Sequence, residues 1–338
     1  MELNLFISNL TNPTLMFFGL GILASTLKSD LEIPASSSKF ISLYLLLSIG
    51  FKGGQELSHS ALTLEVVYAL LFGIAVASMV PFYTFFILKK RMGVADAGAV
   101  AAAYGSVSAV TFVAAASFLE SNQQTFSGYM VAVMALMESP AIIISLFLIN
   151  KYDKQQTGQY SFSNILSHAI TNGSVLLILG SLLIGYLADA RQAEGIRPFT
   201  TDIFKGFLAI FLLEMGMVTA KRISSMRRYG LFLPLVGMLI PAFNGCLIAM
   251  ASSLVTSDPG TRFMFAILAA GASYIAVPAA MRIAAPKADP GIYIPMALGV
   301  SFPFNISIGM VLYWSIIQAN VAGSLSSNLS KLLTYFTL

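Results

Sequence analysis

The chain has 338 residues, of which 57% are hydrophobic and 10% are charged, and its mean hydropathy is +0.81. This composition excludes an ordinary soluble domain and indicates an all-α integral membrane protein. The net charge of +4 is scattered over short loops with no basic face, so nucleic acid is not an expected partner.

Apolar stretches of about 17 or more residues recur along the chain, and each is long enough to cross the ~30 Å hydrocarbon layer as a helix. Strands of a membrane barrel would be shorter and would strictly alternate apolar and polar residues. The breaks between the stretches predict ten transmembrane helices, at 13–27, 36–52, 62–88, 95–118, 128–150, 165–189, 200–221, 229–255, 262–284 and 291–318.

The longest polar stretch, residues 150–164, divides the chain into residues 1–150 and 151–338, with five predicted helices in each. Of the 19 Lys and Arg residues, 13 follow odd-numbered helices, which predicts that both termini lie on the non-cytoplasmic side. An odd number of helices per half makes the second half inverted relative to the first. Three short segments match between the halves at offsets of 166, 167 and 163 residues, starting from Ser48, Ser106 and Met137.

Two segments rich in small and hydroxyl residues predict that helices 4 and 9 are discontinuous. They are Tyr104-Gly-Ser-Val-Ser-Ala-Val-Thr and Ser273-Tyr-Ile-Ala-Val-Pro, in which Pro278 lacks an N–H. Inverted repeats with interrupted helices are typical of secondary transporters, whose substrates bind where the breaks meet. A half-helix that starts at a break offers free N–H groups to an anion. One such segment alone would suggest only close helix packing, whereas the symmetric pair favours a binding site.

Glu138 lies in the fifth predicted helix, two residues before Pro140. A carboxylate in hydrocarbon is costly, which favours a cation ligand or a protonation site. The alternative is a protonated glutamate that is hydrogen-bonded to a neighbouring helix. Across the repeat, Ser301 and Asn305 offer neutral oxygens. The predicted cation-binding residues are therefore Glu138, Ser139, Ser301 and Asn305.

Other charged or metal-binding residues give weaker signals. Glu214 lies outside the paired segments, so we interpret it as an internal packing or gating contact, and His59 and His168 are too isolated for a metal site. The sequence has no P-loop, no His-Glu-x-x-His pair and no Gly-x-Ser-x-Gly turn. We therefore expect no enzyme, no catalytic residue and no cofactor, and we expect sodium to be the coupling ion.

Four motifs resemble, in the same order, the sodium-dependent bicarbonate transporter family of the cyanobacterial SbtA type. They are Ile49-Gly-Phe-Lys-Gly-Gly, Tyr104-Gly-Ser-Val-Ser-Ala-Val-Thr, Met137-Glu-Ser-Pro-Ala and Met215-Gly-Met. The resemblance covers nearly the whole chain. It implies a gate domain of helices 1, 2, 6 and 7 and a core domain of helices 3–5 and 8–10. It also implies a homotrimer in the bacterial cytoplasmic membrane that imports bicarbonate with sodium by an elevator-type motion. The anion-binding segments of the family fall on Gly105, Ser106, Ser108, Thr111, Ser273 and Ala276.

The chain departs from this family in its second segment. Where the family has Ser-Ser-Asp-Ile-Ser-Gly-Pro, this chain has Ala272-Ser-Tyr-Ile-Ala-Val-Pro, so Tyr274 replaces an acid. Glu138 replaces the family's aspartate. These departures leave open a proton- or sodium-coupled carrier of another small anion or carboxylate, and a transport-inactive sensor or scaffold. Because the linker after the fifth helix is short, a PII-like regulatory protein is not assumed as a partner.

Overall fold

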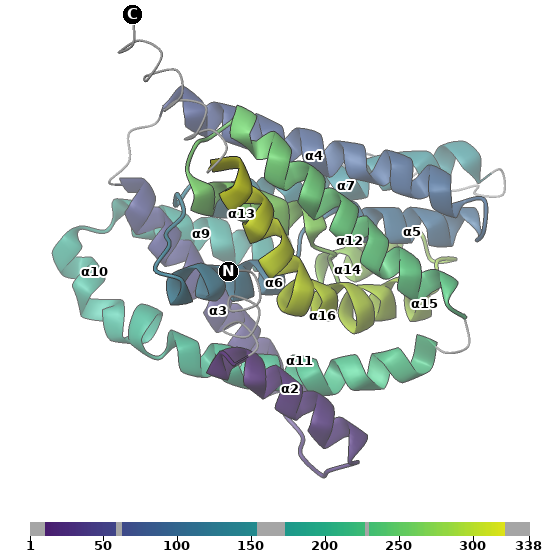
Figure 1. Cartoon of the computed structure of the whole chain (residues 1–338), viewed down its shortest axis with the longest axis horizontal. Coiled ribbons are helices and arrows are strands. Elements are labelled where there is room, and N and C mark those ends of the chain that lie inside the picture. Colours follow the sequence, from purple (N-terminus) through teal and green to yellow (C-terminus); the bar gives the residue numbers. More distant parts are fainter. Residues whose placement is uncertain (1–10, 59–62, 154–172, 227–229, 322–338) are drawn as a thin grey trace, which may run out of the picture.

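The computed structural model describes residues 11–58, 63–153, 173–226 and 230–321, and all regular structure in these ranges is helical (Figure 1). The all-α class is confirmed for this part of the chain. Six of its helices are long and apolar enough to cross a membrane, and two shorter apolar helices accompany them. The number of ten spans and the inverted repeat stay predictions.

The helices of the first half are α2 (Pro13–Thr26), α3 (Ala35–Ser58), α4 (Leu64–Leu88), α5 (Val94–Gly105), α6 (Ala109–Ser121) and α7 (Met130–Tyr152). Those of the second half are α9 (Gly173–Leu187), α10 (Ala190–Arg197), α11 (Phe204–Met226), α12 (Phe232–Ala251), α13 (Pro259–Ala270), α14 (Ala276–Ala284), α15 (Pro290–Met296) and α16 (Phe302–Phe304). Short helical stretches join or follow them, namely η1 (Pro198–Asp202), η3 (Ser252–Leu254), η4 (Ala297–Ser301) and η5 (Asn305–Gly309). Helix continues after η5 to residue 321.

Helical residues occupy every predicted span, but one helix end and one additional helix depart clearly from the prediction. The second helix does not end at residue 52 and continues to Ser58. Its Gly53 and Gly54 resemble a turn in the sequence, yet they lie inside the helix because they permit close packing. The short helix α10, which begins with a capping box at Asp189, was not predicted. Residues 154–172, which include most of the polar stretch and the start of the predicted span 165–189, lie outside the described residues.

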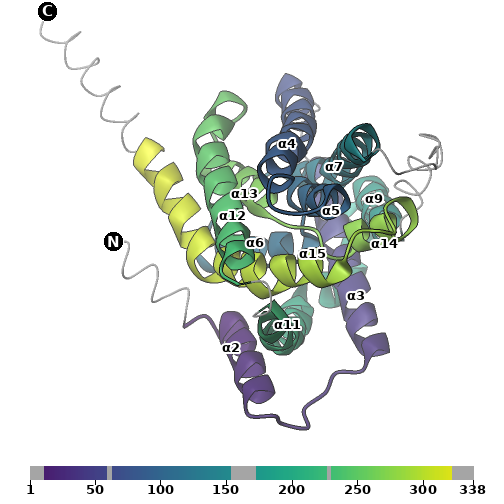
Figure 2. The ribbon, with the colours of Figure 1, turned by 90° about the vertical axis from the view of Figure 1, so that its right-hand side faces the viewer.

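Two helix pairs, α2 with α11 and α3 with α9, pack through glycines. A Cβ atom on Gly21 would lie 2.0 Å from the carbonyl oxygen of Leu213, and one on Gly54 would lie 2.1 Å from that of Leu182. No side chain fits in these positions, so the backbones touch directly. Figure 2 shows α2, α3 and α11 along one side of the molecule, away from α4 and α12.

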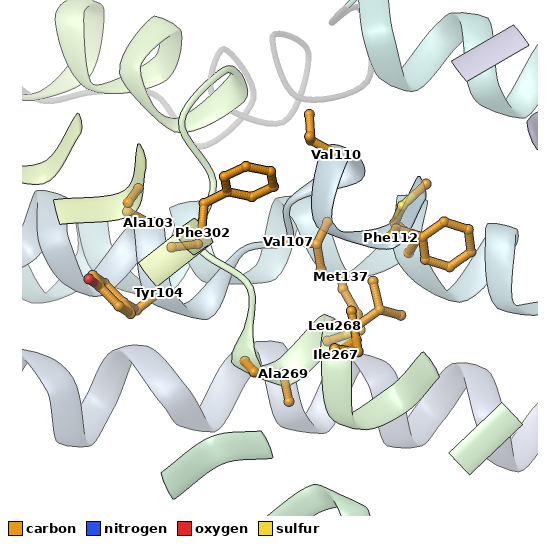
Figure 3. Close-up of a cluster of buried hydrophobic side chains, with 14 of the residues drawn as sticks. Ala103, Tyr104, Val107, Val110, Phe112, Met137, Ile267, Leu268, Ala269 and Phe302 are labelled. Atoms are coloured by element: carbon orange, nitrogen blue, oxygen red, sulfur yellow. The ribbon is translucent and has the colours of Figure 1, made fainter. Parts of the chain in front are cut away.

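The remaining helices form a second group in which α4, α5 and α7 pack on one another and α13 packs on α12 and α6. Apolar side chains fill the centre of this group. Val107, Met137 and Leu268 come from three different elements and meet in Figure 3. The two helix breaks that the sequence predicts therefore lie inside a packed core.

Candidate functional site

The first break separates α5 from α6 at residues 106–108. Ser108 is extended, with φ −107° and ψ 105°, and caps α6. Its Oγ accepts hydrogen bonds from the Thr111 N–H at 3.2 Å and the Thr111 hydroxyl at 2.8 Å. A hydroxyl carries one proton, so the Ser108 O–H can still donate to a ligand.

Gly105 is the last residue of α5, and α4 and α7 approach it closely. A Cβ on this residue would lie 2.4 Å from Cγ of Pro81 and 3.0 Å from Cβ of Ala141. A side chain at this position would push both helices away. Gly105 therefore lets the first break lie close against α4 and α7. It is not among the residues that line the cavity described below.

The second break separates α13 from α14 at residues 271–275. It crosses the first break, since the Ser273 N–H donates to the carbonyl oxygen of Ala103 at 2.8 Å. A Cβ on Gly271 would lie 3.1 Å from the backbone nitrogen of Ser108. Pro278 lies in the first turn of α14, where a missing N–H costs no hydrogen bond. The sequence prediction of two interrupted helices is confirmed at both positions.

A cavity lies where the breaks cross, and it offers about 40 Å³ to the centres of water-sized molecules. One water needs roughly 10–15 Å³ on this measure, so there is room for a few waters or one small ion. The residues that line the cavity are Leu46, Val107, Ser108, Ala109, Val110, Met134, Ala135, Glu138, Ile178, Ser273, Tyr274, Ile275 and Ala276.

The starts of two helices border this cavity. The first N–H groups of any helix lack acceptors within the helix. At the start of α6, Ser108 accepts the Thr111 N–H, which leaves the amides of Ala109 and Val110 for a ligand. At the start of α14, Ser273 Oγ lies 3.5 Å from the Val277 nitrogen, which leaves the amide of Ala276. Both helix starts carry partial positive charge, and both adjacent serines offer hydroxyls.

Glu138 contributes the one carboxylate among the described lining residues. It lies on α7 and is partly buried. Within the described part of the chain, it forms no ion pair and no hydrogen bond with another residue. The described residues that line the cavity include no Lys or Arg. The site therefore combines two electropositive helix starts with an uncompensated acid.

The structure brings four of the predicted site residues together in the cavity lining, namely Ser108, Glu138, Ser273 and Ala276. Thr111 stands behind Ser108 and reaches the site only through that residue. The Ser106 side chain is fully buried outside the lining, and its Oγ has no hydrogen-bond partner among the described residues.

Other predicted residues lie away from the cavity. Ser139 is next to Glu138 on α7 but is not part of the lining. Ser301 Oγ donates to the carbonyl oxygen of Gly237 at 2.7 Å and lies 2.7 Å from the Tyr104 hydroxyl. The Asn305 amide donates to the carbonyl oxygen of Ala270 at 2.7 Å. The structure does not bring Ser301 or Asn305 to Glu138.

Several lining residues were not assigned to the site from the sequence. Leu46 of α3 and Ile178 of α9 close one side, and nothing distinguishes them in the sequence from other apolar residues of membrane helices. Tyr274 stood out in the sequence only as an expected departure from the resembled family. It lines the cavity, and its hydroxyl lies 3.8 Å from the sulfur of Met215 on α11. Glu214, its neighbour on α11, does not line the cavity.

Comparison with known families adds one match. A family model described as the Na⁺-dependent bicarbonate transporter superfamily matches residues 13–318. That range covers about nine-tenths of the chain and includes both breaks, Glu138 and every residue of the cavity lining. No curated protein matches the chain.

Proposed function

The chain belongs to the Na⁺-dependent bicarbonate transporter superfamily and is a multi-pass membrane protein, and from this premise we propose that it imports bicarbonate together with sodium. One observation carries the proposal. Two half-helix starts, two serine hydroxyls and an unpaired carboxylate line the same small cavity. This combination suits one small anion inside the cavity and one cation at the Glu138 carboxylate on its wall.

The anion half of the proposal rests on the two helix starts. Backbone N–H groups at a helix start form an anion site without any basic side chain. We propose that the anion lies between Ser108 and Ser273, against the amides of Ala109, Val110 and Ala276. The limited room favours a small oxyanion such as bicarbonate over a larger carboxylate.

The cation half rests on Glu138. An ionised carboxylate and a monovalent anion at roughly 5 Å repel one another by about 3 kcal/mol at an effective dielectric constant near 20. That repulsion would weaken anion binding about a hundredfold. A sodium ion beside Glu138 removes it, so each ion promotes the binding of the other. Transport of the anion with its cation follows from this mutual dependence.

The distribution of the lining residues over the helices supports an alternating-access step. Every polar lining residue belongs to α6, α7 or the two breaks, whereas α3 and α9 contribute only Leu46 and Ile178. The polar site can therefore move as a unit along an apolar surface, as an elevator-type motion requires. We take α2, α3, α9 and α11 as the static gate domain, because glycine contacts lock these helices in pairs.

The inverted repeat belongs to the same proposal and is supported by matching contacts. Gly50 lies close to the backbone of α9, and Gly216, its counterpart 166 residues later, lies close to that of α2. Helices α4 and α12 also carry a proline at corresponding positions, Pro81 and Pro241. Each half thus contributes one helix to each glycine-packed pair.

Uptake of labelled bicarbonate into proteoliposomes tests the proposal. We expect uptake against a gradient when sodium is high outside, and none when potassium replaces it. Uptake driven by a pH gradient without sodium would instead favour a proton-coupled carrier that uses Glu138. No uptake under either gradient would favour the sensor or scaffold and would refute transport of bicarbonate. Formate, nitrate and acetate as competitors would define the anion class.

The proposal includes a homotrimer in the cytoplasmic membrane with both termini outside. Cross-linking of the purified protein in lipid should stop at the size of three chains. Protease added to intact cells should remove tags from either end. A tag at residue 11 that is protected in intact cells would reverse the proposed orientation.

A further inference from the structure

The carbonyl end of α13 is held by two asparagine side chains from other helices. Asn244 of α12 donates its amide to the carbonyl oxygen of Ala269 at 3.1 Å, and Asn305 of η5 donates to that of Ala270 at 2.7 Å. These carbonyls lie at the end of a helix, where they lack partners within the helix. Both asparagines are almost completely buried, at 3% and 1% exposed.

Each asparagine is itself fixed by a tyrosine. The Tyr83 hydroxyl of α4 donates to Oδ1 of Asn244. The Tyr313 hydroxyl is 3.1 Å from Oδ1 of Asn305 and 3.0 Å from the carbonyl oxygen of Pro241. Both ends of each amide are therefore engaged, and their orientation is set by three neighbouring elements. Buried amides that are bonded at both their oxygen and their nitrogen are rigid and costly to disturb.

The first break has no such pair of asparagines. The paired prolines Pro81 and Pro241 lie 160 residues apart, which makes Thr84 the counterpart of Asn244. The last helices of the two halves match at an offset of 163 residues, which makes Ile142 the counterpart of Asn305. The end of α5 is held instead by the second break, since the Ser273 N–H donates to the carbonyl oxygen of Ala103. The two asparagines thus hold the second break directly and support the first break through Ser273.

We propose that Asn244 and Asn305 are positioning residues of the anion site. By holding the end of α13, they set where the chain leaves that helix, and so where Ser273 and the start of α14 border the cavity. This inference rests on the proposed function for its transport readout. The sequence predicted that Asn305 binds the cation directly. In this proposal Asn305 instead acts on anion binding, through its effect on the position of Ser273.

Asn305→Leu and Asn244→Leu test the proposal, because leucine keeps the approximate volume and removes the amide. Ser307→Ala is the matched control, since Ser307 lies on the same helical stretch and its hydroxyl bonds only to its own helix, at the carbonyl oxygen of Pro303. We expect each leucine variant to raise the KM for bicarbonate about tenfold or more, because a small displacement of groups that position a ligand has effects of this size. The half-saturating sodium concentration, measured at saturating bicarbonate, should change less than threefold, and Ser307→Ala should match the wild type.

Two results would overturn the proposal. A lower melting temperature with an unchanged bicarbonate KM would reduce both asparagines to packing residues. A raised sodium requirement with an unchanged bicarbonate KM would make Asn305 a cation ligand. If a leucine variant does not fold, Tyr313→Phe replaces it in the test, because this change removes the hydroxyl beside Asn305 and keeps the ring. It should also raise the bicarbonate KM. A wild-type KM in this variant would count against the proposal.

Hydrogen exchange separates this inference from the proposed function. The Ser273 amide, bonded to Ala103, should exchange faster in Asn305→Leu than in the wild type, while amides in the middle of α4 keep their protection. If the wild type transports no bicarbonate but this local change appears, the positioning role stands and the proposed function fails. Unchanged exchange at Ser273 would refute the positioning role whatever the transport result.

Discussion

Replacing Ser108 with glycine removes a hydroxyl from the cavity wall while preserving the start of α6. Ser108 has φ −107° and ψ 105°, a conformation that any residue adopts. Glycine is a tolerated cap, and the exchange from serine costs only a few tenths of a kcal/mol. The Thr111 hydroxyl, which donates to Ser108, can turn to a carbonyl of its own helix. The fold should therefore survive, and the effect should fall on the ligand.

The size of that effect follows from the bond that is lost. Ser108 Oγ accepts two hydrogen bonds from Thr111, and its own O–H, which lies beside the Tyr274 hydroxyl, can turn to the anion. A hydrogen bond to a charged group contributes about 1.5–3 kcal/mol. At 1.36 kcal/mol for each factor of ten, its loss should raise the bicarbonate KM about ten- to a hundredfold.

Uptake kinetics in proteoliposomes and thermal unfolding of the purified protein measure the two effects separately. Ser145→Ala is the matched control, because Ser145 is a fully buried serine of α7 that does not line the cavity. We expect its KM to equal that of the wild type. A Ser108→Gly protein with a normal melting temperature and a KM raised less than threefold would refute direct contact between this hydroxyl and the anion.

Three further substitutions test the charge, the packing and the size of the site. Glu138→Gln should abolish the dependence of uptake on the sodium gradient because the acid that repels the anion is gone, and unchanged sodium dependence would exclude Glu138 from coupling. Gly54→Ala should lower the melting temperature by several degrees, because its Cβ would lie 2.1 Å from the Leu182 carbonyl oxygen. Gly180→Ala is the control and should not lower it, because no atom lies within 4 Å of the added Cβ. Equal melting temperatures of the two variants would contradict the close packing at Gly54. Tyr274→Ala should let acetate compete for uptake by enlarging the cavity, and Tyr274→Phe should not; competition by acetate that is the same in all three proteins would rule out a size limit at Tyr274.

The sequence predicts the breaks well because they have local causes. Small and hydroxyl residues, with a proline in the second segment, weaken a helix wherever they occur, so residues 105–111 and 273–278 identify both interruptions without knowledge of the fold. Glu138 is found for a similar reason, because a carboxylate in an apolar membrane helix is energetically costly and usually marks a functional site. Leu46 and Ile178 cannot be found this way. They reach the cavity only because α3 and α9 pack beside the breaks, and their residue type is common in every membrane helix.

Ser301 and Asn305 illustrate a different limit. Matching the halves of the sequence sets Ser301 and Asn305 opposite Glu138, but it does not determine the direction of their side chains. Each lies at the edge of a π-helical stretch, η4 or η5, where the wider turn rotates the helix face relative to a regular α-helix. The Ser301 hydroxyl consequently bonds to Gly237, and the Asn305 amide bonds to Ala270. A repeat found in sequence predicts equivalent positions, whereas side-chain contacts depend on the rotation of each helix.

Where the two breaks cross, the C-terminal ends of α5 and α13 have hydrogen-bond partners, whereas the N-terminal ends of α6 and α14 face the cavity. This difference explains why the site should prefer an anion. The carbonyl ends of α5 and α13 accept hydrogen bonds from Ser273, Asn244 and Asn305, so their partial negative charge is largely neutralised by the protein. The starts of α6 and α14 border the cavity and retain their partial positive charge. Partial charges and hydroxyls are weaker than a basic side chain, and Glu138 opposes them. On the proposed function, binding of the anion should therefore require a cation at Glu138, so that the two ions are transported together.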